Sequence, residues 1–376
     1  MTLSLEHNGA WRQAAEILES LERAIDDPLV RSQVTLRLGR LYTNADRLTM
    51  AREKLQISTA ASATMKSPSW LDAERNVAVA RLFEASGDLE RAERLAAAAS
   101  KLLRSWNATA RQPRVGSALL EASTLRAELA LARGDLESAR SFASQIDHLI
   151  AGEPDLDVVR AVDAEVVSAM TAILCDAGAA VAEDRLWHCY DVALQHGLTR
   201  QCASIAANLA SVLRLRGERD RSIELLETVL PLARAAGGAN ALGGVLVELT
   251  NAYLERNEPT RAASYVRELA EVAASNPYMS AYSRLLQAKL YLEQRAYNEA
   301  LRSAEIAESS LVRLGRDRIV GVALQTQGLA LAALGRRDAA LRTMQLAIDH
   351  QTARNHPRRT LQAKQAMENA RIASHE

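Results

Sequence analysis

Apolar residues recur along this chain at the three- and four-residue spacing of amphipathic helices, and the stretches that carry them come in pairs. The first member of a pair is typified by VAVARLF at 77–83 and VELTNAY at 247–253, the second by ERLAAAASKLL at 93–103 and IELLETVLPLA at 223–233. Strand-forming residues show no alternating runs. The pattern therefore predicts an all-α chain built from units of helix, tight turn and helix.

A short phrase, Gly-Asp-Leu-Glu-x-Ala, marks the turn of two units, at 87–92 and 134–139. Its glycine can take the left-handed conformation that ends a helix, and Asp88 and Asp135 are expected to cap the helix that follows. Equivalents of its alanine recur 38 to 47 residues apart, and the register of the fourth unit, about residues 160–200, stays open. These anchors are Ala51, Ala92, Ala139, Ala182, Ser222, Ala262, Ala300 and Ala340.

Finer spacing distinguishes between families of helical repeat. A small residue lies twelve positions before most anchors, as at Gly39 and Ala80, and a large or aromatic residue lies nine before, as at Tyr42 and Phe83. A period near 40 also fits HEAT or armadillo repeats. The order small, aromatic, then alanine resembles the tetratricopeptide repeat (TPR) over residues 29–350. The resemblance implies a right-handed superhelical solenoid of antiparallel helix pairs, whose neighbouring units bury a continuous core.

The units are longer than the 34 residues of the usual tetratricopeptide repeat. Long units of this kind resemble the sensor superhelix of MalT-like transcriptional activators and the peptide-sensing Rap-type regulators. The chain divides into an N-terminal half-repeat at 1–28, about eight hairpins at 29–350 and a C-terminal capping helix at 351–376. Longer loops are expected at 104–116 and 150–157.

Composition narrows the classes of function. The 376 residues include 46 basic and 46 acidic side chains, so the net charge is zero and direct nucleic-acid binding is not expected. The N-terminal residues show no basic region followed by an apolar stretch, so no signal peptide is expected, and no apolar run is long enough to span a membrane. Cys175, Cys189 and Cys202 are too few for a disulfide framework, so a cytoplasmic protein with reduced thiols is expected.

The sequence carries none of the short motifs that mark common catalytic sites. It has no Walker A loop, no G-x-S-x-G elbow and no H-E-x-x-H pair. LWHCY at 186–190 is the densest group of reactive side chains, yet His188 and His196 stand about two helical turns apart and cannot share a metal alone. We therefore predict a non-catalytic protein without metal or cofactor, in which Cys189 packs as a small apolar residue.

In tetratricopeptide proteins the concave face, formed by the first helix of each pair, usually binds the ligand. Polar residues projected onto that face include amides, which can donate to and accept from a peptide backbone, and cations, which can hold a carboxylate. Several acidic residues, including Glu74, Glu128 and Glu248, project onto the same face. The candidate binding residues are Arg37, Arg40, Arg81, Asn208, Ser211, Arg214, Asn251, Tyr282, Lys289 and Gln325.

These observations favour a regulatory or scaffold protein that binds a peptide or a segment of a partner protein in its concave groove. The alternative is a superhelix that senses a small-molecule effector, as the MalT-like resemblance implies. Self-association through the end repeats is compatible with either function. The sequence does not choose among partners.

Overall fold

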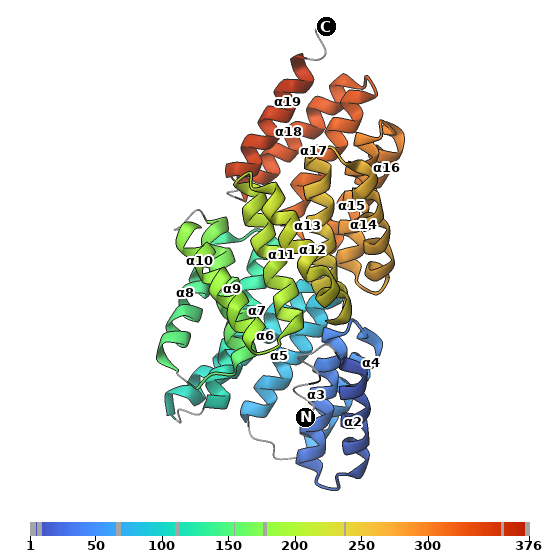
Figure 1. Ribbon diagram of the computed structural model, residues 1–376. Coiled ribbons are helices and arrows are strands. Elements are labelled where there is room, and N and C mark those ends of the chain that lie inside the picture. Colours follow the sequence, from blue (N-terminus) through green and yellow to red (C-terminus); the bar gives the residue numbers. More distant parts are fainter. Residues whose placement is uncertain are drawn as a thin grey trace.

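The computed structural model describes residues 5, 10–64, 69–109, 113–153, 155–175, 179–236, 238–354 and 357–372 (Figure 1). Within these ranges the chain forms α-helices and one short 3-10 helix, with no strand. The helices are α2 (Trp11–Ala24), α3 (Pro28–Asn44), α4 (Leu48–Thr64), α5 (Ser69–Ala85), α6 (Leu89–Thr109), α7 (Pro113–Arg133), α8 (Leu136–Gly152), α9 (Val158–Leu174), α10 (Ala179–Gln195), α11 (Thr199–Leu215), α12 (Arg219–Ala236), α13 (Ala239–Glu255), α14 (Pro259–Val272), η1 (Ala273–Ser275), α15 (Pro277–Glu293), α16 (Tyr297–Arg313), α17 (Asp317–Ala333), α18 (Arg337–Ala353) and α19 (Pro357–Ile372).

The helices from α3 to α18 form eight antiparallel pairs, which confirms the predicted all-α solenoid. The turns between paired helices have the predicted chemistry. Gly87 and Gly134 adopt positive φ of 88° and 75°, a conformation that glycine takes without steric cost. The Asp88 and Asp135 side chains each accept a hydrogen bond at 3.0 Å from a backbone N–H three residues later, so both cap the second helix.

The predicted anchor residues lie where the two helices of each pair meet. All eight, from Ala51 to Ala340, have at most 2% of their surface exposed. Ser222 donates a hydrogen bond at 3.0 Å to the carbonyl of Ala210, the small residue twelve positions earlier. At Gly39, a methyl group would lie 2.6 Å from the side chain of Leu55, so the small residue is required by close helix packing.

The fourth unit has the same architecture as the others, with Ala182 buried in α10 against α9. One expected loop was wrong. Residues 104–109 continue α6 and α7 already begins at Pro113, so most of 104–116 is helical. Residues 110–112 lie outside the described part. The loop expected at 150–157 is shorter than predicted, because α8 continues to Gly152 and α9 begins at Val158.

The odd-numbered helices from α3 to α19 form what we call the inner wall. Each of them packs on the next odd-numbered helix along the chain, in an unbroken series from α3 on α5 to α17 on α19. Elements on the inside of a curved stack approach one another more closely than those outside, so this series marks the concave side. The even-numbered helices form the outer layer (Figure 1).

The superhelix turns far enough for its later repeats to contact its first ones. The Asp46 side chain, after α3, accepts hydrogen bonds from the backbone N–H of Ala239 and from the Asn276 amide, the latter at 3.0 Å. Arg316 bonds Glu84 at 2.6 Å, across 232 residues of sequence. Helix α17 also packs on α7. The carboxyl ends of α3 and α5 therefore lie beside the beginnings of α13, α15 and α17.

Candidate functional site on the inner wall

The structure places all ten predicted binding residues on inner-wall helices. None of their side chains is fully exposed, and Asn251 is buried with 7% of its surface exposed. Two lie on α3, one on α5, three on α11, one on α13, two on α15 and one on α17. Their placement agrees with the register, and their role in binding stays a prediction. In order along the chain they are Arg37, Arg40, Arg81, Asn208, Ser211, Arg214, Asn251, Tyr282, Lys289 and Gln325.

Charged side chains from α3, α5, α7 and α9 converge on the inner wall into a network that we call the N-terminal ion network. Glu121 on α7 lies 3.1 Å from Arg40 on α3 and 3.1 Å from Arg160 on α9. Arg160 also lies 3.3 Å from Glu74 on α5. Arg40–Glu121 and Arg160–Glu74 join helices two units apart, so the wall is strongly curved here and its own side chains meet across it.

The pKa values of two carboxyl groups in the network are shifted in opposite directions. Burial opposes ionisation of Glu121, but Arg40 and Arg160 outweigh it and lower its pKa to about 2. Glu128 pairs with Arg81, yet burial raises its pKa because a single cation offsets only part of the desolvation cost. Arg40 and Arg81, both predicted to bind a ligand, are therefore already held by carboxylates of the wall.

The next part of the wall is built by α11, α13 and α15. Arg214 lies 3.2 Å from Glu248 and also pairs with Glu255, both on α13. Lys289 donates a hydrogen bond at 3.2 Å to the Asn251 side-chain oxygen. Burial, with the nearby charge of Arg214, lowers the pKa of Lys289 to about 8. Lys289 is thus a half-buried amine whose hydrogen-bond partner in the wall is an uncharged amide.

Three predicted residues keep their hydrogen-bonding capacity unused. The side chains of Asn208, Ser211 and Gln325 make no hydrogen bond to the described part of the chain, although all three are half-buried. Asn208 and Ser211 lie one turn apart on α11, so they share a face of that helix. Polar groups in this state can exchange their bound water for the backbone groups of a ligand.

Two further cations on this wall were missed by sequence reasoning. Arg359, on α19, donates a hydrogen bond to the backbone carbonyl of Arg318, on α17. Burial and the charge of Arg318 lower the pKa of Arg359 to about 10. Tyr282 lies edge-on to Tyr278, with ring centroids 5.9 Å apart. The repeat register did not project Arg318 or Arg359, and the adjacent basic residues at 358 and 359 were the one signal for Arg359.

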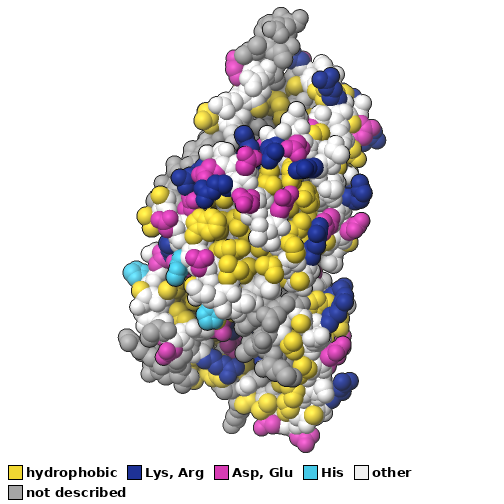
Figure 2. Space-filling view, in the orientation of Figure 1, with side chains coloured by type: hydrophobic (Ala, Val, Ile, Leu, Met, Phe, Trp, Pro, Cys, Tyr) yellow, Lys and Arg dark blue, Asp and Glu magenta, His cyan; other side chains and the backbone are white. Residues whose placement is uncertain are grey.

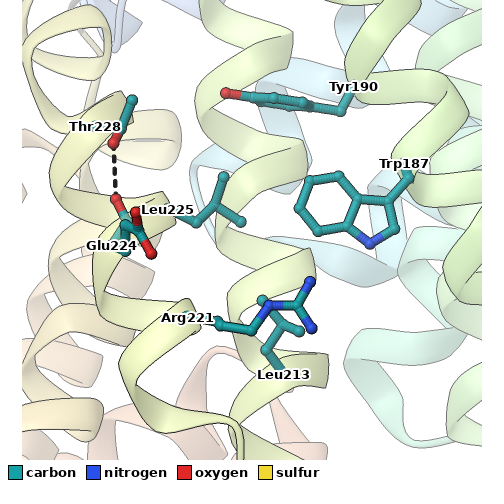
Figure 3. Close-up of a pocket in the computed structure, with 7 residues that line it drawn as sticks. All are labelled: Trp187, Tyr190, Leu213, Arg221, Glu224, Leu225 and Thr228. Carbon is teal, nitrogen blue, oxygen red and sulfur yellow. Dashed lines mark hydrogen bonds between the residues drawn. The ribbon is translucent and has the colours of Figure 1, made fainter.

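The outer layer carries a separate pocket of about 330 Å³ between α10 and α12 (Figure 3). The rings of Trp187 and Tyr190 form one side of it and lie edge to face, 6.1 Å apart. Figure 2 shows hydrophobic side chains gathered over α10, α11 and α12. Cys189 is buried, which raises its pKa to about 12, whereas His188 is exposed. The packing role predicted for LWHCY agrees with this arrangement.

Neither a metal-binding group nor a membrane-spanning helix occurs in the described ranges. These ranges hold no group of three or more His, Cys, Asp or Glu side chains arranged to bind a metal ion. Among the helices that the structure describes, none is both long and apolar enough to cross a bilayer. The polar groups of the inner wall therefore remain the main candidate site.

Comparison with known proteins supports the repeat assignment. A family model of the tetratricopeptide repeat matches residues 205–239, which cover most of α11 and α12. No curated protein matches the chain in sequence. The match confirms the tetratricopeptide pattern in the fifth unit, and the paired antiparallel arrangement of helices continues through the other units.

Several solved structures have the same fold at low sequence identity. The Rap conjugation gene regulator of plasmid pLS20, in complex with the Phr* peptide, is 11% identical, with 94% of this chain and 96% of that chain covered and a TM-score of 0.58. A Rap protein complexed with competence and sporulation factor is 12% identical (91% and 98% covered, TM-score 0.57). The apo quorum sensor NprR from B. thuringiensis is 14% identical (93% and 96% covered, TM-score 0.56). At these identities the likeness shows a shared fold.

Proposed function

We propose that this protein is a regulator that binds an extended peptide, or an extended segment of a partner protein, along the inner wall between α11 and α17. The observation that carries this proposal is the set of half-buried polar side chains with unused hydrogen bonds, Asn208, Ser211 and Gln325. An amide side chain can donate to a peptide carbonyl and accept from a peptide N–H at once.

The position of this segment favours a peptide over a compact ligand. Asn208 and Asn251 lie on successive inner-wall helices, which pack directly on one another. An extended strand rises about 3.3 Å per residue, so amides on successive helices can hold backbone groups several residues apart. One of the structures that share this fold, the pLS20 Rap regulator, contains a bound peptide, which agrees with peptide binding.

The test is selection from a displayed library of random peptides, followed by calorimetry of the selected peptides. We expect Asn208→Ala and Asn251→Ala each to weaken binding about fivefold, since a hydrogen bond contributes about 1 kcal/mol. The matched control is Asn298→Ala, because Asn298 is exposed on the outer helix α16. Equal losses in all three variants would contradict an inner-wall site.

A small-molecule effector is the second candidate, and the Tyr278–Tyr282 pair on α15 is the observation that favours it. Aromatic faces stack on sugars and other planar or apolar metabolites. A metabolite screen by thermal shift separates the two functions. Stabilisation by a metabolite that depends on Tyr282, with no binder from the peptide library, would replace the peptide proposal.

A further inference from the structure

The inner wall near α15, α17 and α19 holds more positive than negative charge. Four cations act on one another there, Arg214, Lys289, Arg318 and Arg359, as the lowered pKa values of Lys289 and Arg359 indicate. Two carboxylates of α13 face them, and both are paired with Arg214. Within the described part of the wall, no carboxylate forms an ion pair with Arg318, Arg359 or Lys289, which we call the cationic cluster.

This arrangement differs from that of three other arginines that join inner-wall elements in the described chain. Arg40, Arg160 and Arg316 each lie within 3.3 Å of a carboxylate, at 3.1, 3.3 and 2.6 Å. Arg318 and Arg359 have no carboxylate within ion-pair distance among the described residues, and Arg359 bonds a neutral carbonyl instead. Leaving half-buried cations unpaired costs stability, so such groups usually mark a place where an anion binds.

Tyr282 adds a neutral hydrogen-bond donor to the cluster. Burial and the neighbouring Tyr278 raise its pKa to about 12, so its hydroxyl stays protonated and can donate a hydrogen bond. Arg318 and Arg359 both act on this hydroxyl electrostatically. Tyr278 is held in place by Arg316, whose guanidinium lies 4.4 Å from its ring centroid. Planar guanidinium groups and a hydroxyl donor suit the two oxygens of a carboxylate.

We propose that Arg318, Arg359 and Lys289, with the Tyr282 hydroxyl, form a binding site for a carboxylate group of the ligand. The proposal rests on the proposed function, because it supplies one end of the peptide site. The carboxylate belongs either to the C-terminus of the peptide or to an acidic side chain. Arg318 and Arg359 each supply a guanidinium donor, from α17 and α19, and Lys289 supplies a third positive charge from α15.

The first experiment needs no peptide. Citrate, a small carboxylate probe, is titrated at constant ionic strength, and binding is followed by thermal shift and calorimetry. We expect citrate to stabilise the wild type, and Arg318→Met and Arg359→Met each to weaken its binding about tenfold. The matched control is Arg342→Met, because Arg342 is exposed on the outer helix α18. A wild type without a citrate response, or equal responses in all variants, overturns the site.

Stability without citrate provides a second readout. Arg318→Met removes a cation without a carboxylate partner, so we expect the variant to melt at or above the temperature of the wild type. A structural arginine would behave oppositely, because its removal would lower the melting temperature and leave the citrate response unchanged. That combination would contradict the proposal even if Arg359→Met, at the end of the solenoid, fails to fold.

Peptides selected from the library identify the source of the carboxylate. Amidation of the C-terminus weakens binding if the terminal carboxylate is bound, and Asp→Asn or Glu→Gln changes weaken it if a side chain is bound. A citrate response with no peptide binder means that the peptide function fails and the anion site stands. Peptide binding that is indifferent to both changes, with no citrate response, means that the anion site fails and the peptide function stands.

Discussion

The two halves of the inner wall share one repeat geometry but balance their charges differently. Between α3 and α9, Glu74 and Glu121 neutralise Arg40 and Arg160, and each of these side chains contacts another that belongs to the wall. Between α11 and α19, polar and cationic groups remain without such partners in the described part of the chain, and Arg359 is the clearest example. Repeat spacing therefore does not determine which part of the wall can bind.

The difference indicates that the first half of the wall has a structural role and that the second half is the better candidate for ligand binding. Ion pairs that join helices two units apart, such as Arg40 with Glu121, link α3 directly to α7 and so help to fix the curvature of the first repeats. Their hydrogen-bonding capacity is used within the protein, so a ligand would have to break them. The second half can bind a ligand without breaking ion pairs, because its polar side chains without a protein partner need only release bound water.

The largest expected effect comes from breaking the N-terminal ion network. Glu121→Ala removes the carboxylate that lies 3.1 Å from both Arg40 and Arg160, and leaves Arg160 with Glu74 at 3.3 Å. Because these side chains are largely buried, we expect a loss of about 3 kcal/mol in the free energy of unfolding, measured by urea denaturation.

The control for this prediction is a pair at the surface. Glu90 lies 3.4 Å from Arg94 on α6, with 83% and 66% of the two side chains exposed. Glu90→Ala should change stability by at most about 0.5 kcal/mol, because solvent screens exposed ion pairs. If both substitutions cost the same, the network has no structural role and the contrast between the two halves disappears.

The contact that joins the two halves gives the next largest effect. Asp46 is 5% exposed and accepts hydrogen bonds from the Ala239 backbone and the Asn276 amide. Asp46→Ala leaves both donors without this acceptor, so we expect a loss of about 2 kcal/mol. Hydrogen exchange should increase at the start of α13. Unchanged exchange there, with the same loss of stability, would place the effect within α3 instead.

The repeat geometry itself should respond alike in both halves. Gly39 and Gly328 occupy the same register, and a methyl group would lie 2.6 Å from Leu55 in the first and 2.5 Å from Met344 in the second. Each Gly→Ala change should cost about 1 to 2 kcal/mol through overpacking. The unbranched Met344 side chain adapts more readily than Leu55, so the cost should be smaller at Gly328. Thermal denaturation of both variants tests this order.

The sequence alone was sufficient for the scaffold because the scaffold depends on local spacing. Gly87 ends a helix, Asp88 caps the next, and Ala92 allows the pair to touch, all within six residues. Even the fourth unit, whose register was uncertain, has its anchor Ala182 buried as the others are. The ten projected residues fall on the inner wall for the same reason.

Whether those residues are already paired within the protein depends on long-range contacts, which no local sequence pattern encodes. Glu121 meets Arg40 across 81 positions because the superhelix curves, and curvature is a property of the whole stack. The register projected Arg40 but gave no sign that a carboxylate two units away would bind it. Arg318 was missed because it belongs to the first turn of α17, where the register was not projected.

The smallest expected effect concerns the protonation of Lys289 in the second half. Burial, Arg214 and Arg359 lower its pKa, while Glu248 and Glu255 act in the opposite direction, and the net result is a pKa of about 8. In the unfolded chain this lysine has its ordinary pKa of about 10.4. Between about pH 8 and about pH 10.4 the unfolded chain therefore binds more protons than the folded protein. Stability contributed by this group therefore rises as the pH increases from about 8 to about 10, by roughly 1 kcal/mol between pH 8 and 9.

Comparison of Lys289→Met with the wild type isolates this contribution from other titrating groups. The difference in unfolding free energy between the two proteins should change with pH above about 8, whereas the difference for Lys101→Met should not, because Lys101 is exposed on α6. A bound carboxylate favours the charged amine, so citrate should raise the pH at which Lys289 loses its proton. If citrate leaves that pH unchanged, no carboxylate binds beside Lys289. The positive charges of the second half then have only a structural role, as the charges of the first half do.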